Sequence, residues 1–405
     1  MKVRPPTILA LASFEKGQDF LRQCKQLGAR VLLLTSQSLR GVAKWPTESI
    51  DGLYFIKDKD KTWEREETLK AVSYLARTEL IDRIVALDDF DLENAAALRE
   101  HLRIPGLGDS ATRHFRDKLA MRVRASAAGV RVPEFVHLLH RDSVRAFCAT
   151  VPGPWVMKPR HLASSAGIKK MHSVDDILRR ADDLGDEQSH HLLERYLPGN
   201  VLHVDSIVDG GEVRFACASA YGKPPLDVAH DGDVFTSQLL VRGTPEEQEA
   251  IAMNREVLRA MGHVRGASHT EFIRATADGK LYFLETSARV GGAHIAELVD
   301  AALGVNLWAD WAKVELADED TPPYAPAPLR DEYAGILLSL AKDLAPDSSA
   351  FTDPEIVWRL AKDHHIGLIV RSPDPKRVDE LVRSYSDRIH RDHHAYLPPQ
   401  DRPTA

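Results

Sequence analysis

The sequence has few cysteines, no long apolar run and no excess of basic residues, and each absence excludes a class of protein. Its three cysteines, Cys24, Cys148 and Cys217, have neither the even count of a disulfide framework nor the spacing of a metal site, so we expect a reducing compartment, with the cytoplasm as the default. A formal net charge of -7 gives no general attraction for nucleic acid or an anionic membrane. An anionic ligand would need a local basic site.

Targeting segments and two common phosphate-binding motifs are also absent. The apolar run Ile8 to Ala12 is too short for a signal peptide or a membrane span. The residues that come after it, Ser13 to Gly17, contain one glycine, so the dinucleotide fingerprint G-x-G-x-x-G is missing. The P-loop pattern is missing as well, and any phosphate site must therefore use another device.

Apolar runs alternate with amphipathic stretches near the amino terminus. This alternation predicts a parallel sheet with flanking helices. The predicted strands are Ile8–Ala12, Ala29–Thr35, Gly52–Ile56 and Ile81–Leu87. The predicted helices are Glu64–Leu80 and Leu92–Leu102. At 405 residues the chain is too long for one ordinary core, and two to four domains are expected.

The pattern changes after Pro105-Gly106. The elements predicted there are a helix that contains Lys118, a helix at Val144–Cys148, strands at Trp155–Lys158 and Leu192–Glu194, a helix at Val174–Leu184, a hairpin of Val201–Val208 and Val213–Ala220, and a long helix from Thr244 to Met261. A proline-rich linker, Thr321–Pro328, precedes a small α+β unit with strands at Tyr333–Leu340 and Ile366–Arg371 and a helix at Pro375–Ile389. We expect the final residues, Pro398–Ala405, to be disordered.

Two glutamates flank a turn signal. A three-residue loop, Ala277–Gly279, with the glycine in the left-handed conformation sets Glu271 directly across from Glu285, whereas a two-residue loop would put them on opposite faces. Facing carboxylates destabilise a ladder by roughly 0.2–1 kcal/mol when exposed. A shared hard cation such as Mg2+ would remove that penalty. A solvated hairpin is the alternative.

The residues after Glu285 add a hydroxyl and a guanidinium group. If the strand stays extended, Ser287 and Arg289 lie on the face of Glu285. Gly291 and Gly292 would let backbone approach a ligand closely, and arginine binds a phosphate or carboxylate with two hydrogen bonds. An ordinary turn is the alternative explanation of the glycine pair.

Two further segments offer ligand groups. Lys158 ends an apolar strand, and its ammonium group could reach a phosphate while Ser164–Gly167 offers hydroxyl and backbone N–H groups. A lysine that extends to solvent is the alternative. Glu194 also ends an apolar strand, before the turn Pro198-Gly199. Its carboxylate could accept a hydrogen bond from the exocyclic amine of a flat heterocycle.

Taken in order, these motifs resemble those of ATP-grasp enzymes, which are ATP-dependent carboxylate ligases, from about residue 3 to about residue 318. The resemblance implies the ATP-grasp fold, with α/β and α+β parts. It implies an N-terminal Rossmann-like domain over 1–110, a small lobe over 111–197, a large lobe over 198–320 and a C-terminal α+β domain over 330–392. The implied cofactors are ATP and Mg2+ or Mn2+.

The resemblance also implies roles for single residues. Lys118 and Lys158 resemble the two phosphate-binding lysines, and Ser164, Ser165 and Gly167 belong to the loop over the β and γ phosphates. Glu194, Tyr196 and Leu197 resemble the adenine hinge, and His203 and Asp205 are the two residues expected near the ribose. Glu271 and Glu285 resemble the magnesium-bridging acids, and Arg289 the arginine that meets the transferred phosphate. Ser287 stands where the family usually has a metal-binding asparagine.

Within the family, His269-Thr270-Glu271 and Arg289–His294 look most like the branch that joins a carboxylate to an amine, including ligases that form dipeptides. The implied substrates are small molecules, and His294 is a candidate to steer one of them. The carboxylate would become an acyl-phosphate, from which the amine displaces phosphate. Lysines, Arg289 and Mg2+ would spread the charge of the transferring group.

Two other functions remain open. One is a carboxylase that uses bicarbonate, with biotin or a purine intermediate as the acceptor. The other is a regulatory protein that binds ATP without turnover. No nucleic acid or membrane partner is expected, and a homodimer is the base-rate expectation for a protein of this kind.

Overall fold

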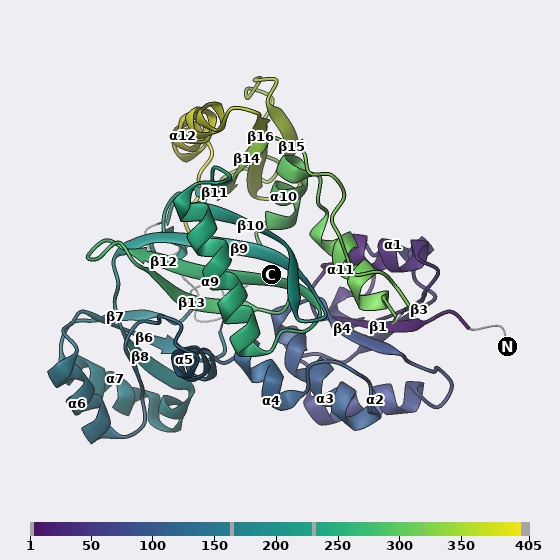
Figure 1. Ribbon diagram of the computed structural model, residues 1–405, viewed down its shortest axis with the longest axis horizontal. Coiled ribbons are helices and arrows are strands. Elements are labelled where there is room, and N and C mark those ends of the chain that lie inside the picture. Colours follow the sequence, from purple (N-terminus) through teal and green to yellow (C-terminus); the bar gives the residue numbers. More distant parts are fainter. Residues whose placement is uncertain (1–3, 163–165, 229–231, 319, 398–405) are drawn as a thin grey trace.

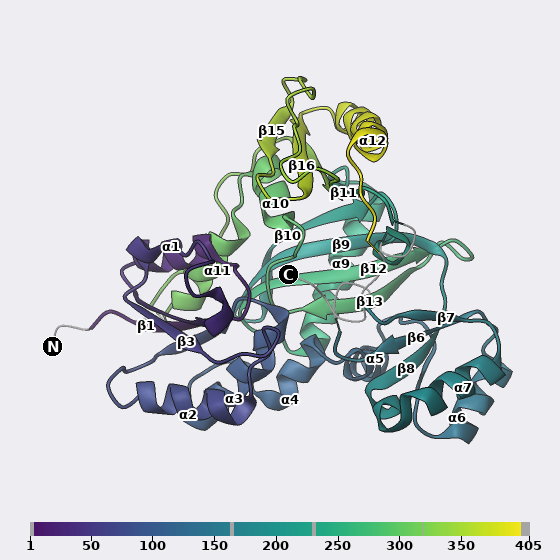
Figure 2. The same ribbon diagram turned by 180° about the vertical axis from the view of Figure 1, so that it is seen from behind.

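Three sheets organise the computed structural model, which describes residues 4–162, 166–228, 232–318 and 320–397 (Figures 1 and 2). The first is the predicted parallel sheet, with strand order β3-β2-β1-β4. Its strands and helices are β1 Thr7–Ala12, α1 Gln18–Gln26, β2 Arg30–Ser36, β3 Gly52–Ile56, α2 Arg65–Leu75, β4 Arg83–Ala86, α3 Leu92–Leu102 and α4 Asp109–Thr112. Helix α2 ends at Leu75 rather than Leu80, whose side chain is 67% exposed. Apolar side chains that bury both faces of β1 and β2 account for the parallel arrangement.

A second, smaller sheet is antiparallel and has the order β5-β8-β6-β7. The elements of this part are α5 Lys118–Ala127, β5 Phe135–His137, α6 Arg141–Thr150, β6 Trp155–Pro159, β7 Lys169–Met171, α7 Val174–Leu184 and β8 His191–Arg195. The helix predicted at Val174–Leu184 is confirmed as α7, and Ser173 caps it, because its hydroxyl accepts a hydrogen bond from the Asp176 N–H. The small sheet lies beside the large one at the bottom left of Figure 1.

The third sheet has eight strands in the order β13-β12-β9-β10-β11-β14-β16-β15. Its first part contains β9 Gly199–Asp209, β10 Glu212–Tyr221, α8 Pro225–Asp227, β11 Phe235–Leu239, α9 Pro245–Met261, β12 Gly266–Ala275, β13 Leu281–Ser287, α10 Ile295–Leu303 and α11 Leu307–Leu316. The predicted start and stop of α9 are confirmed. Thr244 accepts a hydrogen bond from the Glu247 N–H, and Gly262 ends the helix with a φ of 78°.

The chain after the proline-rich linker does not build a sheet of its own. Its elements are β14 Tyr333–Leu340, β15 Ile356–Arg359, β16 His365–Ser372 and α12 Pro375–Asp392. Strand β14 pairs with β11 from Phe235↔Leu338 to Gln238↔Gly335, so these strands extend the large sheet. The predicted segment Pro398–Ala405 lies outside the described residues. Short 3-10 helices complete the described chain: η1 Gln37–Leu39, η2 Thr47–Ser49, η3 Asp89–Asp91, η4 Arg113–Phe115 and η5 Gly185–His190.

The hairpin of β12 and β13 has the predicted pairing but not the predicted turn. Glu271 is paired with Glu285, as expected. The strands are joined by a longer turn, in which the Ala275 N–H bonds to Lys280 O and Arg274 pairs with Leu281. That turn alone would place Glu271 opposite Leu284. A β-bulge between Glu271 and Phe272 shifts the register by one residue and brings the two acids face to face.

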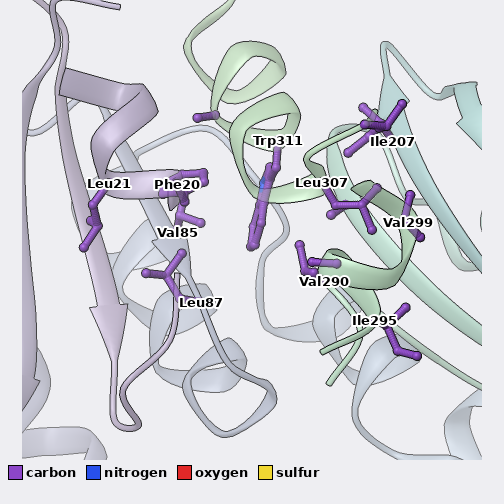
Figure 3. Close-up of a cluster of buried hydrophobic side chains, with 14 of the residues drawn as sticks. Phe20, Leu21, Val85, Leu87, Ile207, Val290, Ile295, Val299, Leu307 and Trp311 are labelled. Atoms are coloured by element: carbon purple, nitrogen blue, oxygen red, sulfur yellow. The ribbon is translucent and has the colours of Figure 1, made fainter. Parts of the chain in front are cut away.

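A shared apolar core joins the parallel sheet to the large sheet. Trp311 of α11 lies between side chains of the two parts (Figure 3), and its ring centroid is 5.1 Å from that of Phe20. Leu87 follows β4 on one side, and Val290 follows β13 on the other. The loops after these two strands therefore meet over one packed core, which fixes their relative position.

In the part of the chain that the structure describes, none of the helices is both long enough and apolar enough to cross a membrane.

Candidate active site

Two adjoining cavities meet along the β12–β13 hairpin. The inter-lobe cavity, of about 370 Å³, lies between the small and the large sheet, and Lys158, Glu194 and Tyr196 are among its lining residues. The junction cavity, of about 340 Å³, is lined by residues that include Asp89, Ser287 and Arg289. Five residues line both cavities: Lys118, Leu162, Pro225, Glu271 and Glu285. The paired glutamates therefore stand at the boundary between the two spaces.

Lys118 neutralises one of the paired acids. It is the first residue of α5, which Asp117 caps by accepting from the backbone N–H groups of Leu119 and Ala120. The Lys118 Nζ is 2.6 Å from Glu285 Oε2 and donates to Leu162 O at 2.8 Å. Its ammonium group thus lies at the shared boundary, where phosphate oxygens would bring further negative charge.

A buried chain of polar groups supports the other acid. The Tyr221 hydroxyl donates to Glu271 Oε1 at 2.8 Å, and His269 Nε2 lies 3.7 Å from the same oxygen. The other His269 nitrogen, Nδ1, is 2.8 Å from Asp205 Oδ1. Burial by itself would lower the pKa of His269, but the Asp205 and Glu271 carboxylates raise it to about 10. His269 is therefore a cation at neutral pH. Burial would raise the pKa of Glu271, but His269 and the Tyr221 hydroxyl lower it.

Gly291 fits closely over this chain. A Cβ atom there would lie 2.8 Å from His269 Nδ1 and 2.9 Å from Asp205 Oδ1. A side chain at this position would push on the contact between the two groups. One member of the predicted glycine pair is thus required by the packing, whereas a Cβ at Gly292 would meet no atom within 4 Å.

Glu194 lies beneath the inter-lobe cavity between two cations. Its side chain is 1% exposed, with Oε1 2.7 Å from Arg122 Nε and Oε2 2.8 Å from Lys158 Nζ. Burial would raise the pKa of Glu194, but Arg122 and Lys158 lower it more strongly. The sequence predicts this carboxylate as a partner for an adenine amine. Each oxygen of Glu194 lies within ion-pair distance of a cation, and contact with an adenine amine stays a prediction.

The predicted hinge and phosphate loop are only partly described. Tyr196 and Leu197 line the inter-lobe cavity, and Lys170 Nζ lies 3.7 Å from the centre of the Tyr196 ring. Ser164 and Ser165 lie outside the described residues. Gly167 has a φ of 69°, and a Cβ there would approach Pro159 Cγ to 2.8 Å, so glycine is needed for the chain to turn.

Asp89 is the main site residue that the sequence analysis missed. It begins η3, just beyond the carboxyl end of β4, and accepts hydrogen bonds from the Ser287 hydroxyl and from Arg289, whose Nε lies 2.8 Å from Oδ2. Burial would raise the pKa of Asp89, but Arg289 and Arg116 lower it well below its usual range. The Ser287 hydroxyl donates to this acid, and its contact with a metal ion stays a prediction. The sequence signal that could have found Asp89 is its position just after a predicted parallel strand, because parallel sheets bind ligands at the carboxyl ends of their strands.

Three predicted residues lie away from the cavity walls. His203 and Asp205 are fully buried, with His203 Nδ1 2.7 Å from Asp205 Oδ2, and neither lines the two cavities. They lie behind His269, and contact with a ribose stays a prediction. His294 has a φ of 56°, lies 3.0 Å from Glu297 Oε1 and packs against Trp358. Its neighbour Ala293, rather than His294 itself, lines the junction cavity.

Comparisons with known proteins agree with this arrangement. No family model matches the chain. The L-arginine-specific L-amino acid ligase of Bacillus subtilis is 24% identical over 233 residues, 56% of this chain and 56% of that protein. The structure of an L-amino acid ligase from Bacillus licheniformis superposes with a TM-score of 0.73 at 15% identity and covers 98% of this chain and 100% of that one.

The chain has the ATP-grasp fold. The fold predicted from the sequence is confirmed. A biotin carboxylase from Campylobacter jejuni, solved as its β,γ-ATP complex, matches the same fold with a TM-score of 0.68 at 14% identity over 93% of this chain and 90% of that one. The chain spans 56% of the length of the B. subtilis L-arginine-specific ligase.

Proposed function

We propose that this ATP-grasp protein is an ATP-dependent ligase that joins an amino acid or a related small carboxylate to an amine. The observation that carries the proposal is the position of Glu271 and Glu285, paired across one ladder and lining both cavities. The inter-lobe cavity would hold the nucleotide and the junction cavity the carboxylate. The B. subtilis and B. licheniformis ligases support the amino-acid class of substrate.

The donor set fits Mg2+, because two carboxylates at one boundary are the oxygen ligands that this ion prefers. Bound Mg2+-ATP would supply the γ-phosphoryl group that converts the carboxylate into an acyl-phosphate, from which the amine displaces phosphate. Glu271 and Glu285 would hold the ion. Lys118 would move its charge from Glu285 toward the phosphates as the ion takes its place on that acid.

The other cations have distinct tasks in this proposal. Lys158, held by Glu194, would bind phosphate oxygens from the small sheet. Arg289 binds Asp89 through Nε and Nη2, so its plane is fixed toward the junction cavity that it lines. Its remaining N–H groups would bind the carboxylate and then the acyl-phosphate. Fixed donors of this kind stabilise a developing charge without reorganising.

The test is ADP release by the purified protein with Mg2+-ATP. Pools of amino acids and other carboxylates are supplied with and without amines, and bicarbonate is supplied separately. The proposal predicts that a pool of amino acids, which carry both a carboxylate and an amine, supports ADP release by itself, whereas carboxylates without an amino group support it only when an amine is added. ADP release with bicarbonate alone would favour the carboxylase, and Mg2+-ATP binding without ADP release under any condition would favour the regulatory protein.

A matched pair of variants separates a site effect from a loss of charge. Glu285→Gln removes one acid at the cavity boundary, and we expect it to abolish pool-dependent ADP release. Glu256→Gln removes one acid from the exposed surface of α9 and should leave the rate unchanged. Equal rates in the two variants would contradict the assigned role of Glu285.

A further inference from the structure

We propose that a third cavity, behind the junction cavity, binds a small oxyanion bearing a phosphate or carboxylate group. This arginine cavity, of about 320 Å³, has three arginines in its wall, Arg83, Arg99 and Arg265, with Glu315 as the one acid. The four charges leave an excess of two positive charges in a protein whose net charge is -7. The proposal goes beyond the ligase reaction and does not depend on it.

Two of the arginines, Arg99 and Arg83, are held in place without being neutralised. Arg99 donates from Nε to Ile84 O at 2.8 Å and from Nη1 to Leu107 O at 3.1 Å. Arg83 donates from Nε to the backbone oxygen of Glu315 at 3.2 Å. Carbonyl oxygens orient these two guanidinium groups but carry no formal charge, so both keep the capacity to bind an anion.

Arg265 is the least constrained of the three. Across the described residues its side chain forms no hydrogen bond or ion pair. Glu315 lies among the three guanidinium groups, yet in the described chain none of them is within ion-pair distance of its carboxylate. Burial outweighs their combined effect and raises the pKa of Glu315. The cavity thus keeps opposite charges apart, as expected of a space that a charged ligand fills.

A buried polar atom also lacks a partner at this cavity. His263 is 3% exposed and lines the wall, and its Nε2 lies 3.2 Å from Ala267 O. Since a carbonyl oxygen only accepts, Nε2 carries the proton and Nδ1 is an acceptor. Within the described residues Nδ1 has no hydrogen-bond partner. An anion that also carries a hydroxyl group, such as hydrogen phosphate or a hydroxy acid, would bind the arginines and donate to Nδ1.

The cavity is open to solvent and joins two parts of the fold. Val264, at its edge, is 57% exposed, and Pro105 and Gly106 are exposed beside it. Its walls come from β4 and α3 on one side and from Ala288 and α11 on the other. Ala288 lies between Ser287 and Arg289, the two residues that bind Asp89. A bound anion would therefore tie the parallel sheet to the large sheet next to the catalytic groups.

The test is calorimetric titration of the full chain with inorganic phosphate and, separately, with malate, a hydroxy-dicarboxylate. Three variants are compared with the parent protein. Arg265→Ala removes a charge from the cavity, and Arg255→Ala removes one from the exposed surface of α9. Lys158→Ala removes a cation from the inter-lobe cavity. We expect Arg265→Ala to weaken binding at least about tenfold, and Arg255→Ala and Lys158→Ala to leave it unchanged.

The two ligands distinguish a phosphate from a carboxylate ligand. Loss of phosphate binding in Arg265→Ala indicates that the cavity binds a phosphate group, and loss of malate binding indicates that it binds a carboxylate group. Binding that is lost in Lys158→Ala but kept in Arg265→Ala would place the anion in the inter-lobe cavity and overturn the proposal. Absence of binding by either ligand would overturn it as well. Should Arg265→Ala fail to fold, the Nε–H resonance of Arg265 in the parent protein must shift on titration.

Discussion

Replacing Gly291 by alanine tests the buried chain of polar groups behind Glu271. The added Cβ would lie 2.8 Å from His269 Nδ1 and 2.9 Å from Asp205 Oδ1, both below the 3.4 Å at which ordinary contact begins. Overpacking of this kind costs about 1–3 kcal/mol. The two atoms that it meets bind each other at 2.8 Å, so relief of the overlap requires that this contact lengthen. We expect Gly291→Ala to lower the free energy of unfolding by about that amount.

Gly292→Ala is the matched control, because its Cβ would meet no atom within 4 Å and its φ is not in the left-handed region. Gly292 lines the junction cavity, so the comparison uses thermal unfolding by scanning calorimetry rather than activity. A second measurement is the 15N titration of the His269 imidazole. A longer contact to Asp205 should lower the pKa of His269 below its value of about 10. Equal unfolding temperatures and equal titrations in the two variants would show that a Cβ at position 291 does not disturb the contact between His269 and Asp205.

Three further predictions address other contacts of the site. Asp89→Asn removes the charge that fixes Arg289, and we expect kcat/KM for ADP release to fall at least about tenfold. An unchanged kcat/KM would exclude a role of Asp89 in positioning Arg289. Arg122→Met leaves the buried carboxylate of Glu194 with one of its two cations, and we expect the free energy of unfolding to fall by about 3–5 kcal/mol, measured by calorimetry. An unchanged free energy of unfolding would show that Lys158 alone balances the charge of Glu194. The folded-state pKa of His269, about 10, exceeds its ordinary value of 6.5, so its contribution to stability is full below pH 6.5 and is lost as pH rises through 10. The stability difference between the parent protein and His269→Gln should therefore shrink from pH 6.5 to 10, and a constant difference would contradict the assignment.

The sequence predicts the elements and the acids well because their signals are local. The parallel strands are expected from buried apolar runs, and α9 from Thr244, Glu247 and Gly262 at its ends. The facing of Glu271 and Glu285 is also confirmed, although by a bulge that local turn rules do not contain. Bulges depend on the neighbouring strands, which one sequence does not reveal.

Contacts between distant segments are not predictable from the sequence in this way. Asp89 meets Ser287 and Arg289 only because β4 and β13 end over one core. Arg122 is a similar case. An arginine on a short helix is usually at the surface, but the side chain of Arg122 is fully buried against Glu194. Charge pairs of this kind arise from tertiary packing. They decide which predicted residues face a ligand and which support another residue.

The continuity of the eight-stranded sheet bears on how the protein can be divided. The proline-rich segment Thr321–Pro328 looks like a natural place to cut the chain, but removal of the carboxy-terminal strands would take β14 away from β11. Strand β11 would then present unpaired backbone groups, which is a template for edge-to-edge aggregation. A shortened version that keeps the residues lining the inter-lobe and junction cavities would therefore need a substitute for β14, or charged residues along the exposed edge. The carboxy-terminal strands thus contribute to solubility as well as to architecture.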